Sequence, residues 1–328
     1  MERDVVIVGG GVVGLTTGVV LAERGWRVRV WTRDDVAGTT SAVAGALWWP
    51  YHIEPQVSAR AWALESLDVF RELAARGEGG VRMAEGVLGE RSLAEVGWLA
   101  GAVPGLREAT PEEYPVGAGL WARLPLVDMA VYLPWLRGRL ERAGGSVEPR
   151  TVGGLAEADA AVVVNCAGLG ARELAGDREV RPVRGQLVIV ENPGVKHWVV
   201  SGAVEDGEGG DSDGGEGGGE GGSLTYFFPQ PGRLLLGGTA EEDAWSLTPD
   251  PAVAEAIVRR CAVLRPEIAG ARVLGHRVGL RPARGVVRLE RGVLEDGRTV
   301  VHHYGHGGAG VTVAWGCARE AAGLVEGA

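Results

Sequence analysis

Three glycines near the N-terminus have the spacing of a turn that holds a phosphate. Gly9, Gly11 and Gly14 form a GxGxxG pattern between an apolar run, Val5 to Val8, and a stretch typical of a helix. Glycines at these positions allow a sharp turn and a close approach to a pyrophosphate, while the start of the helix attracts negative charge. A second apolar run, Val28 to Trp31, completes a βαβ unit of about thirty residues. In this setting the pattern predicts a dinucleotide site.

The residues after the second run leave the identity of the dinucleotide open. Thr32 and Arg33 stand where an acid usually binds a ribose, and Asp34 and Asp35 follow. Arg33 is compatible with a 2′-phosphate and therefore with NADP. A second glycine cluster, within His302 to Thr312, precedes a C-terminal helix and offers a further set of backbone N–H donors. Two separate helix starts of this kind favour a large cofactor held at both ends, so we expect FAD, with a nicotinamide dinucleotide as the alternative.

The partner of Arg281, in the C-terminal part of the chain, is a second question of chemistry. Arg281 lies between Leu280 and Pro282 in the segment VGLRPAR, and the nearest acids along the chain are Glu267 and Glu290. A buried guanidinium without an anionic partner is costly, by several kcal/mol. We expect Arg281 to be buried and to pair either with an acid from elsewhere in the fold or with an anionic ligand.

The composition excludes several classes of partner. The 328 residues carry a formal net charge of −10, and seven of the acids lie in a glycine-rich stretch, residues 205–222, which predicts a disordered loop. A negative chain argues against nucleic acid and against an anionic membrane surface. No apolar run approaches the roughly 18 residues of a membrane span, and no signal peptide begins the chain. We therefore expect a cytoplasmic protein, and the sequence is compatible with a homo-oligomer.

The cysteines and the C-terminal histidines predict no metal site. The chain has three cysteines, Cys166, Cys261 and Cys317. They show neither CxxC spacing nor a neighbouring histidine cluster, so we expect buried, reduced thiols. His302, His303 and His306 lack a carboxylate partner and the helical spacing of a zinc site. They are interpreted as structural residues whose hydrogen bonds are satisfied. We therefore predict no metal site.

The order of the predicted elements indicates two interleaved domains. Helices are expected at about 59–75, 128–143 and 251–264, strands at 162–164, 185–191 and 224–228, and irregular structure with short strands at 80–125. We predict an α/β fold, in which a Rossmann-type FAD-binding domain is interleaved with an α+β substrate domain built on an antiparallel sheet. The FAD-binding domain takes residues 1–50, 145–185 and 265–328, and the substrate-binding domain takes 51–144 and 186–264.

Four segments resemble the family of D-amino acid oxidases and D-aspartate oxidases. VVHHYGHGGAGVTVAWGCA, residues 300–318, resembles the C-terminal signature of that family over its whole length. TTSAVAGALWWPY, residues 39–51, resembles its flavin loop, and LTYFFP and GLRPAR occur in the family's order and spacing. The resemblance covers nearly all of the chain and is weakest between residues 75 and 125.

The resemblance implies a reaction and a set of substrate contacts. FAD is bound non-covalently, hydride passes from the α-carbon of a D-amino acid to flavin N5, and dioxygen reoxidises the flavin to give hydrogen peroxide. The imino acid hydrolyses to a 2-oxo acid and ammonia. Arg281 matches the residue that binds the substrate carboxylate, and Tyr226 matches the tyrosine that also contacts it. The carbonyl of Gly308 matches the acceptor for the substrate amine, and Tyr51 is expected on the substrate side.

The resemblance also assigns contacts with the cofactor. Arg33 and Asp34 match a pair near the adenosine, Thr40 and Ser41 supply hydroxyls to the phosphates, and Val152 contacts adenine through its backbone. The complete set predicted to bind FAD, in chain order, is Gly9, Gly10, Gly11, Val12, Val13, Gly14, Arg33, Asp34, Thr40, Ser41, Gly45, Ala46, Leu47, Val152, Gly168, Gly307, Gly308, Gly310, Val311 and Thr312.

Two departures from the family pattern bear on the substrate. The second active-site tyrosine of the animal members has no counterpart in the glycine-rich stretch, so the outer wall of the pocket differs. D-aspartate oxidases have an arginine directly after GGT, where this chain has Ala240, Glu241 and Glu242. We therefore expect neutral D-amino acids as substrates, with dioxygen as the acceptor. The alternatives are a glycine or secondary-amine oxidase or dehydrogenase of the same flavin superfamily, an NAD(P)-dependent dehydrogenase, and a non-catalytic flavin-binding protein.

Overall fold

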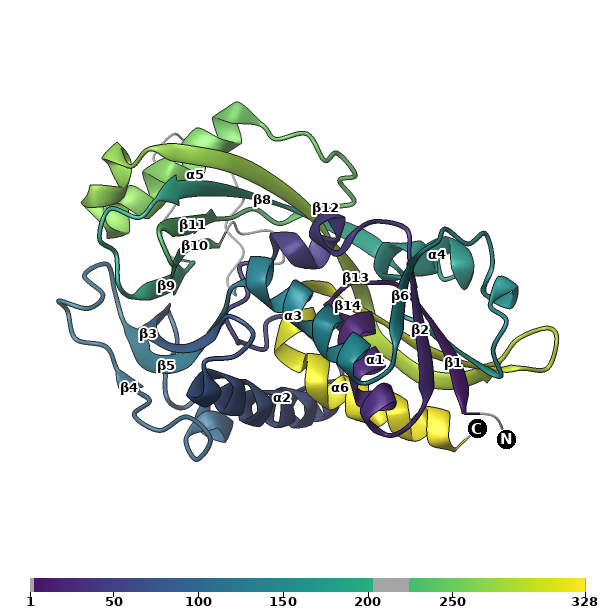
Figure 1. Ribbon diagram of the computed structural model, residues 1–328. Helices are drawn as coiled ribbons and strands as arrows, with labels where there is room; N and C mark the ends of the chain where they lie inside the picture. Colours follow the sequence, from purple (N-terminus) through teal and green to yellow (C-terminus); the bar gives the residue numbers. More distant parts are fainter. Residues whose placement is uncertain (1–2, 203–223, 328) are drawn as a thin grey trace. The chain divides into compact units, whose positions relative to one another are not determined.

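The chain forms two compact units, each assembled from separate segments. The computed structural model describes residues 3–202 and 224–327, and the predicted disordered loop at 205–222 lies outside these residues. The first unit comprises residues 1–82, 127–182 and 281–328, and the second comprises 83–126 and 183–280. Figure 1 labels the helices and strands. Within the described residues no helix is both long and apolar enough to span a membrane.

The first unit is built on a parallel sheet. Its strands are β1 (Asp4–Val8), β2 (Arg27–Thr32), β6 (Ser146–Pro149), β7 (Val162–Asn165), β14 (Thr299–His306) and the C-terminal part of β13 (Val273–Val293). They lie in the order β13-β14-β7-β1-β2-β6, with every pair parallel except β13 and β14. All five residues of β1 are buried, as expected for a central parallel strand covered on both faces.

Helices surround this sheet. They are α1 (Val12–Glu23), α2 (Gln56–Arg76), α3 (Met129–Arg142), α4 (Ala171–Leu174) and α6 (Gly310–Glu326). Helix α1 packs against both α3 and α6, and α6 packs along α2 (Figure 1). The crossing of α2 and α6 is close, because a Cβ on Gly316 would lie only 2.4 Å from the Cα of Trp62. Ser66 Oγ accepts hydrogen bonds from the backbone N–H groups of Trp315 and Gly316, which fixes α6 at this crossing.

The second unit is mainly an antiparallel sheet with one covering helix. Its strands are β3 (Val81–Gly89), β4 (Arg107–Glu108), β5 (Gly119–Val127), β8 (Arg181–Glu191), β9 (Trp198–Ser201), β10 (Thr225–Gln230), β11 (Arg233–Gly237) and β12 (Glu241–Glu242). Strands β9, β10, β11 and β8 pair in an antiparallel manner, and β3 joins β9 in parallel. Helix α5 (Pro251–Leu264) packs on β10 and β11 through Ile257, Cys261 and Leu264.

The predicted fold class, a parallel α/β part interleaved with an antiparallel part, is confirmed, whereas some segments differ from expectation. Residues 51–82 and 127–144, expected in the substrate domain, belong to the first compact unit, because α2 packs on α6 and α3 packs on α1. The segment 80–125, expected to be irregular with short strands, holds the nine-residue strand β3 and most of the nine-residue strand β5, so its strands are longer than expected. The GLRPAR segment lies within β13, a strand of 21 residues that contributes to both units.

Candidate active site

The carboxyl ends of the parallel strands bring together the segments predicted to bind the cofactor. Gly9 follows β1, Arg33 follows β2, and Val152 comes shortly after β6. Gly168 and Gly307 come just after β7 and β14. Since β6, β2, β1, β7 and β14 are neighbours and run parallel, their carboxyl ends share one edge. Dinucleotides bind at this edge in open α/β sheets, so the arrangement is that of a dinucleotide site assembled from five chain segments.

The first glycine turn is packed so closely that side chains do not fit. Gly9 has a φ of +121°, and a Cβ there would lie 2.2 Å from the carbonyl oxygen of Cys166. A Cβ on Gly14 would lie 1.9 Å from the carbonyl oxygen of Gly9, and one on Gly10 would lie 2.5 Å from Thr32 Oγ1. The turn therefore requires glycine for the backbone conformation at Gly9 and for the contact between helix α1 and strand β1 at Gly14.

The start of helix α1 has the donors that a pyrophosphate needs. The N-cap is Gly11, which has no side chain to cap the helix, and the first turn, VVG, contains no acid. The N–H of Val12 donates to Ser41 Oγ at 3.0 Å, so the hydroxyl proton of Ser41 is left for another acceptor. A Cβ on Gly11 would lie 3.0 Å from this oxygen and would fill the same space. Backbone N–H groups at a helix start together with a hydroxyl fit a phosphate group.

At the end of β2 the charge of Arg33 is already balanced. Arg33 donates through Nε and Nη2 to Asp34 Oδ2, at 3.1 and 2.8 Å. The hydrogen bond and the charge of this carboxylate raise the pKa of the Arg33 guanidinium. An arginine that is paired in this way is a weaker ligand for a 2′-phosphate, which favours FAD over NADP at this position. Val152 is half-buried against the apolar cluster around Trp31, next to the same edge of the sheet.

The second glycine-rich helix start lies beside the first. Gly310 opens α6, and a Cβ there would come within 3.9 Å of Val13 Cγ2 in α1. Thr312 Oγ1 donates to the carbonyl oxygen of Trp49 at 3.0 Å and accepts from its N–H at 3.3 Å. Thr312 thus joins the predicted flavin loop to the start of α6. In that loop Ala46 has a φ of +57°, and its carbonyl oxygen accepts from the N–H of Val127 at 3.0 Å.

Three of the predicted substrate residues are neighbours within the first unit. A Cβ on Gly308 would lie 3.6 Å from Arg281 Cδ, 3.9 Å from Arg281 Nε and 3.7 Å from Tyr51 Cδ1. Gly308 itself is exposed, and Arg281 and Tyr51 are half-buried. The expectation that Arg281 is buried was therefore wrong, because the residue is only half-buried and lies next to the exposed Gly308. A guanidinium, an aromatic ring and an exposed backbone carbonyl can together bind a small zwitterion.

Tyr226 lies in the second unit, on strand β10. Its ring stacks on Phe228, with the ring centroids 4.8 Å apart. A Cβ on Gly237 would lie 2.2 Å from Tyr226 Cζ, and one on Gly238 would lie 2.9 Å from its hydroxyl oxygen. These two glycines of GGT therefore make room for the phenol. The role of Tyr226 in binding the substrate stays a prediction.

The expectation about the C-terminal histidines was wrong for two of the three. His302 Nδ1 lies 3.5 Å from Asn165 Nδ2, and burial lowers the pKa of His302 to about 4. His303 and His306 are buried, but among the described residues neither Nε2 atom has a hydrogen-bond partner. Cys317, which has no histidine close to it along the chain, lies in space with its sulfur within 4.8 Å of a ring nitrogen of both His303 and His306. Spacing along the chain could not show this, because Cys317 comes from the following helix.

One residue that supports the site gives no signal in the sequence. The Oδ2 atom of Asp177, in the loop after α4, accepts from Arg284 Nε at 3.0 Å, Tyr304 Oη at 2.9 Å and Arg288 Nη1 at 3.4 Å. Burial alone would raise the pKa of the Asp177 carboxyl, but the hydrogen bonds from Tyr304 and Arg284 outweigh it and lower the pKa. Asp177 lies about 100 residues before Arg281 in the chain, and it fixes the strand that carries Arg281.

Comparison with known proteins supports the same fold and a flavin cofactor. The family model described as "FAD dependent oxidoreductase" matches residues 4–324. A D-amino-acid oxidase of Streptomyces coelicolor is 69% identical, over 99% of this chain and 98% of its own, and one of Rubrobacter xylanophilus is 48% identical, over 97% and 94%. Human D-aspartate oxidase is 36% identical, over 98% and 94%. Among solved structures, glycine oxidase from Geobacillus kaustophilus superposes with a TM-score of 0.78 at 21% identity, over 98% of this chain and 94% of that one.

The chain belongs to the family of FAD-dependent oxidoreductases that includes the D-amino-acid oxidases. The resemblance noted in the sequence is confirmed, and so is FAD as the cofactor, over the nicotinamide dinucleotides. The glycine oxidase, at 21% identity, supports the fold alone.

Proposed function

We propose that this protein catalyses the oxidative deamination of neutral D-amino acids, with FAD as cofactor and dioxygen as electron acceptor. The products are a 2-oxo acid, ammonia and hydrogen peroxide. The observation that carries the proposal is the grouping of Arg281, Tyr51 and the exposed Gly308 in the unit that has the two glycine-rich helix starts. The 69% identity to a D-amino-acid oxidase supports it.

Arg281 is the proposed ligand of the substrate carboxylate. A guanidinium presents two parallel N–H donors, which match the two oxygens of a carboxylate and fix its plane as well as its position. Half-burial suits this task, because the head group can reach a ligand while its aliphatic part packs beside Gly308. Tyr226 is proposed as a second carboxylate ligand, through its hydroxyl.

The other proposed contact is the carbonyl oxygen of Gly308. It accepts a hydrogen bond from the substrate amine, so that carboxylate and amine are held at two fixed points and the α-hydrogen takes one direction only. Bound FAD would supply the oxidising chemistry, a two-electron oxidation of the substrate for which dioxygen is the final acceptor. The contribution of the protein is then mainly orientation, which can lower a barrier by several kcal/mol without an acid or base side chain.

The preference for neutral side chains is supported by the residues after GGT. Glu241 accepts a hydrogen bond from Arg184 at 2.6 Å, and the side chain of Arg184 is only 5% exposed. Arg184 also donates to the carbonyl oxygens of Ser246 and Thr248, at 2.9 and 2.8 Å. The guanidinium of Arg184 is thus fully engaged within the second unit, and it is no ligand for an acidic side chain of a substrate.

An anaerobic titration tests the reaction and its stereochemistry. The flavin-loaded protein is mixed without oxygen with D-alanine or D-valine, then with each L-enantiomer, glycine and D-aspartate. We expect bleaching by the neutral D-amino acids only, and return of the flavin spectrum with peroxide on admission of air. Bleaching by glycine or sarcosine but by no D-amino acid would instead identify a glycine or secondary-amine oxidase. Equal rates with D-aspartate would contradict the proposed neutral preference.

The Arg281→Met variant tests the carboxylate contact. It removes two charge-assisted hydrogen bonds of about 1.5–3 kcal/mol each. We expect kcat/KM for D-alanine to fall by about 10²–10⁴-fold, while the flavin stays bound. A variant that keeps kcat/KM within about threefold of the unmodified protein would refute the assignment.

The cytoplasm is the proposed location. Cys166, Cys261 and Cys317 are all buried and free of disulfide bonds in the described part of the chain, which suits a reducing compartment. A homo-oligomer stays a prediction, and sedimentation of the flavin-loaded protein would test it.

A further inference from the structure

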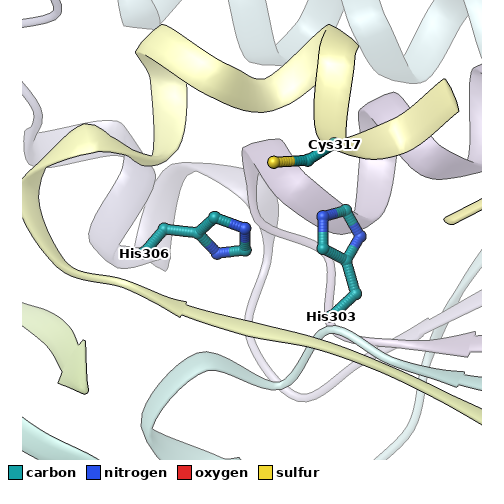
Figure 2. Close-up of side chains that lie close together, drawn as sticks. All are labelled: His303, His306 and Cys317. Atoms are coloured by element: carbon teal, nitrogen blue, oxygen red, sulfur yellow. The ribbon is translucent and has the colours of Figure 1, made fainter. Parts of the chain in front are cut away.

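Two histidines and a cysteine form a compact buried cluster behind the second glycine-rich loop. His303 and His306 come from the end of β14 and Cys317 from helix α6, and Figure 2 shows the two imidazole rings and the thiol close together. One ring nitrogen from each histidine and the Cys317 sulfur all lie within 4.8 Å of one another. The rings meet edge to face, with centroids 5.0 Å apart. All three residues are at most 3% exposed.

The contacts around His303 Nδ1 favour one tautomer of the ring. Thr17 Oγ1 donates to the carbonyl oxygen of Val13 at 2.8 Å, which leaves this oxygen as an acceptor. His303 Nδ1 lies 3.1 Å from Thr17 Oγ1 and completes this arrangement in the tautomer that carries the proton on Nδ1. The neutral ring then carries no proton on Nε2. A lone pair on Nε2 results, in the form in which histidine binds a metal.

The lone pair on His303 Nε2 and the nearby His306 Nε2 have no partner within the described part of the chain. Neither His303 Nε2 nor His306 Nε2 has a hydrogen-bond partner among residues 3–202 and 224–327, although both are buried. An unpaired polar atom in a protein interior is destabilising. Two imidazole nitrogens beside a thiol are a typical set of ligands for a soft metal ion.

We propose that His303, His306 and Cys317 bind one monovalent, thiophilic metal ion, Cu(I). Thiolate and imidazole ligands select copper and zinc among the biological metals. Two neutral imidazoles and one thiolate carry a single negative charge, which a monovalent ion balances. A divalent ion would leave a net positive charge in a buried site, which is unfavourable. Structural zinc, moreover, takes four protein ligands, and within the described part of the chain three are grouped at this position.

The geometry requires an adjustment of the side chains. With metal–nitrogen and metal–sulfur bonds of about 2.0–2.3 Å, three ligand atoms in a plane around one ion lie about 3.5–3.7 Å apart. The present limit of 4.8 Å therefore has to contract by about 1.2 Å, which side-chain rotation can supply. On binding, the Cys317 thiol loses its proton to solvent and the thiolate joins the metal, without any change in oxidation state. The ion would connect β14 to α6 and so close the short loop that contains Gly307, Gly308 and Gly310.

The test is a competition for Cu(I) under anaerobic conditions. The flavin-loaded protein is titrated with Cu(I) held by a chromophoric chelator, and the copper retained after gel filtration is counted. We expect one equivalent per chain, with at least tenfold weaker retention in Cys317→Ser and in His303→Asn. Cys261→Ser is the matched control, since it also replaces a buried thiol by a hydroxyl, and it should retain the full equivalent.

Several outcomes would overturn the proposal. They are complete retention of copper by the chelator, equal retention by Cys317→Ser, and binding of one equivalent of Zn(II) in place of Cu(I). If the variants do not fold, as judged from the flavin spectrum, X-ray absorption of the unmodified protein loaded with copper decides. A shell of one sulfur and two nitrogens supports the site, and a shell without sulfur refutes it. The readout is metal content, so it is independent of the oxidase activity.

Discussion

The contact between Gly14 and Gly9 allows a quantitative test of the nucleotide turn. A Cβ on Gly14 would lie 1.9 Å from the carbonyl oxygen of Gly9 and 3.0 Å from its carbonyl carbon. Real Cβ atoms essentially never come closer than 3.0 Å to another heavy atom, so in Gly14→Ala the start of α1 must move by about 1 Å from β1. The obstacle is backbone and has no other rotamer. The donors at the start of α1 move with it.

The displacement sets the magnitude of two effects. Overpacking of a buried contact costs about 1–3 kcal/mol, and the upper end applies to backbone. Alanine in place of a helical glycine returns roughly 0.5–1 kcal/mol, so we expect the flavin-free protein to lose about 2 kcal/mol of stability. Moving the donors by about 1 Å weakens about two charge-assisted hydrogen bonds to the pyrophosphate, worth about 1.5–3 kcal/mol each. The Kd for FAD should therefore rise by about 10²–10⁴-fold.

The measurement is titration of the flavin-free protein with FAD, followed by quenching of flavin fluorescence, with urea unfolding in parallel. Gly18→Ala is the matched control, because Gly18 is a buried glycine of the same helix. A Cβ there meets only side chains, Val30 Cγ2 at 3.3 Å and Leu140 Cδ1 at 3.4 Å, which can give way. We expect its Kd for FAD to stay within about threefold of the unmodified protein. Tight FAD binding by Gly14→Ala, or an equal loss in Gly18→Ala, would refute the reasoning.

Three further substitutions test other parts of the two units. Gly308→Ala adds a methyl group 3.6 Å from Arg281 Cδ, which is an ordinary contact. The melting temperature should therefore change by less than about 2 °C, while KM for D-alanine rises about tenfold or more. An unchanged KM would contradict the assigned site. Gly237→Ala places a Cβ 2.2 Å from Tyr226 Cζ, so the phenol must move. We expect kcat/KM to fall by about tenfold or more while the affinity for FAD is kept. Loss of FAD instead would argue against the proposed role of Tyr226 in binding the substrate. The pKa of Asp177 is lowered on folding, so its stabilisation is present above the unfolded pKa of about 3.9 and is lost as the pH falls through the lower folded value. Asp177→Asn should therefore lower the free energy of unfolding in urea by about 2 kcal/mol at pH 7 and by much less in strong acid. An equal loss at both pH values would count against a role for the ionised carboxylate.

Local patterns predicted the nucleotide-binding part well. The GxGxxG turn, the helix after it and the two flanking strands are contiguous in the chain, so spacing and apolar periodicity define them together. Helix α5, predicted at 251–264, begins and ends at those residues, because Asp250 caps its start and Pro251 suits the first turn. These elements depend on neighbours in sequence, which is the information that a sequence offers directly.

Contacts between distant segments could not be predicted in this way. Asp177 and Arg284 are 107 residues apart, and no pattern marks the pair. Arg281 was expected to be buried because its neighbours Leu280 and Pro282 are apolar, but exposure depends on what packs over the strand. The grouping of Cys317 with His303 and His306 likewise depends on how α6 lies on the sheet. The predicted substrate domain included α2 and α3 because amphipathic patterns show that a helix packs, without showing on which partner.

The edge formed by five parallel strands has a consequence for the lifetime of the protein in a cell. Its loops come from positions between Gly9 and Gly307, so a ligand bound there connects segments that lie far apart in the chain. A ligand that binds the folded state alone stabilises it by about 2.7 kcal/mol when its free concentration is 100 times Kd. Newly made chains in a flavin-poor cell would then open more often and reach proteases sooner. The abundance of the protein would follow riboflavin supply even at constant rates of transcription and translation.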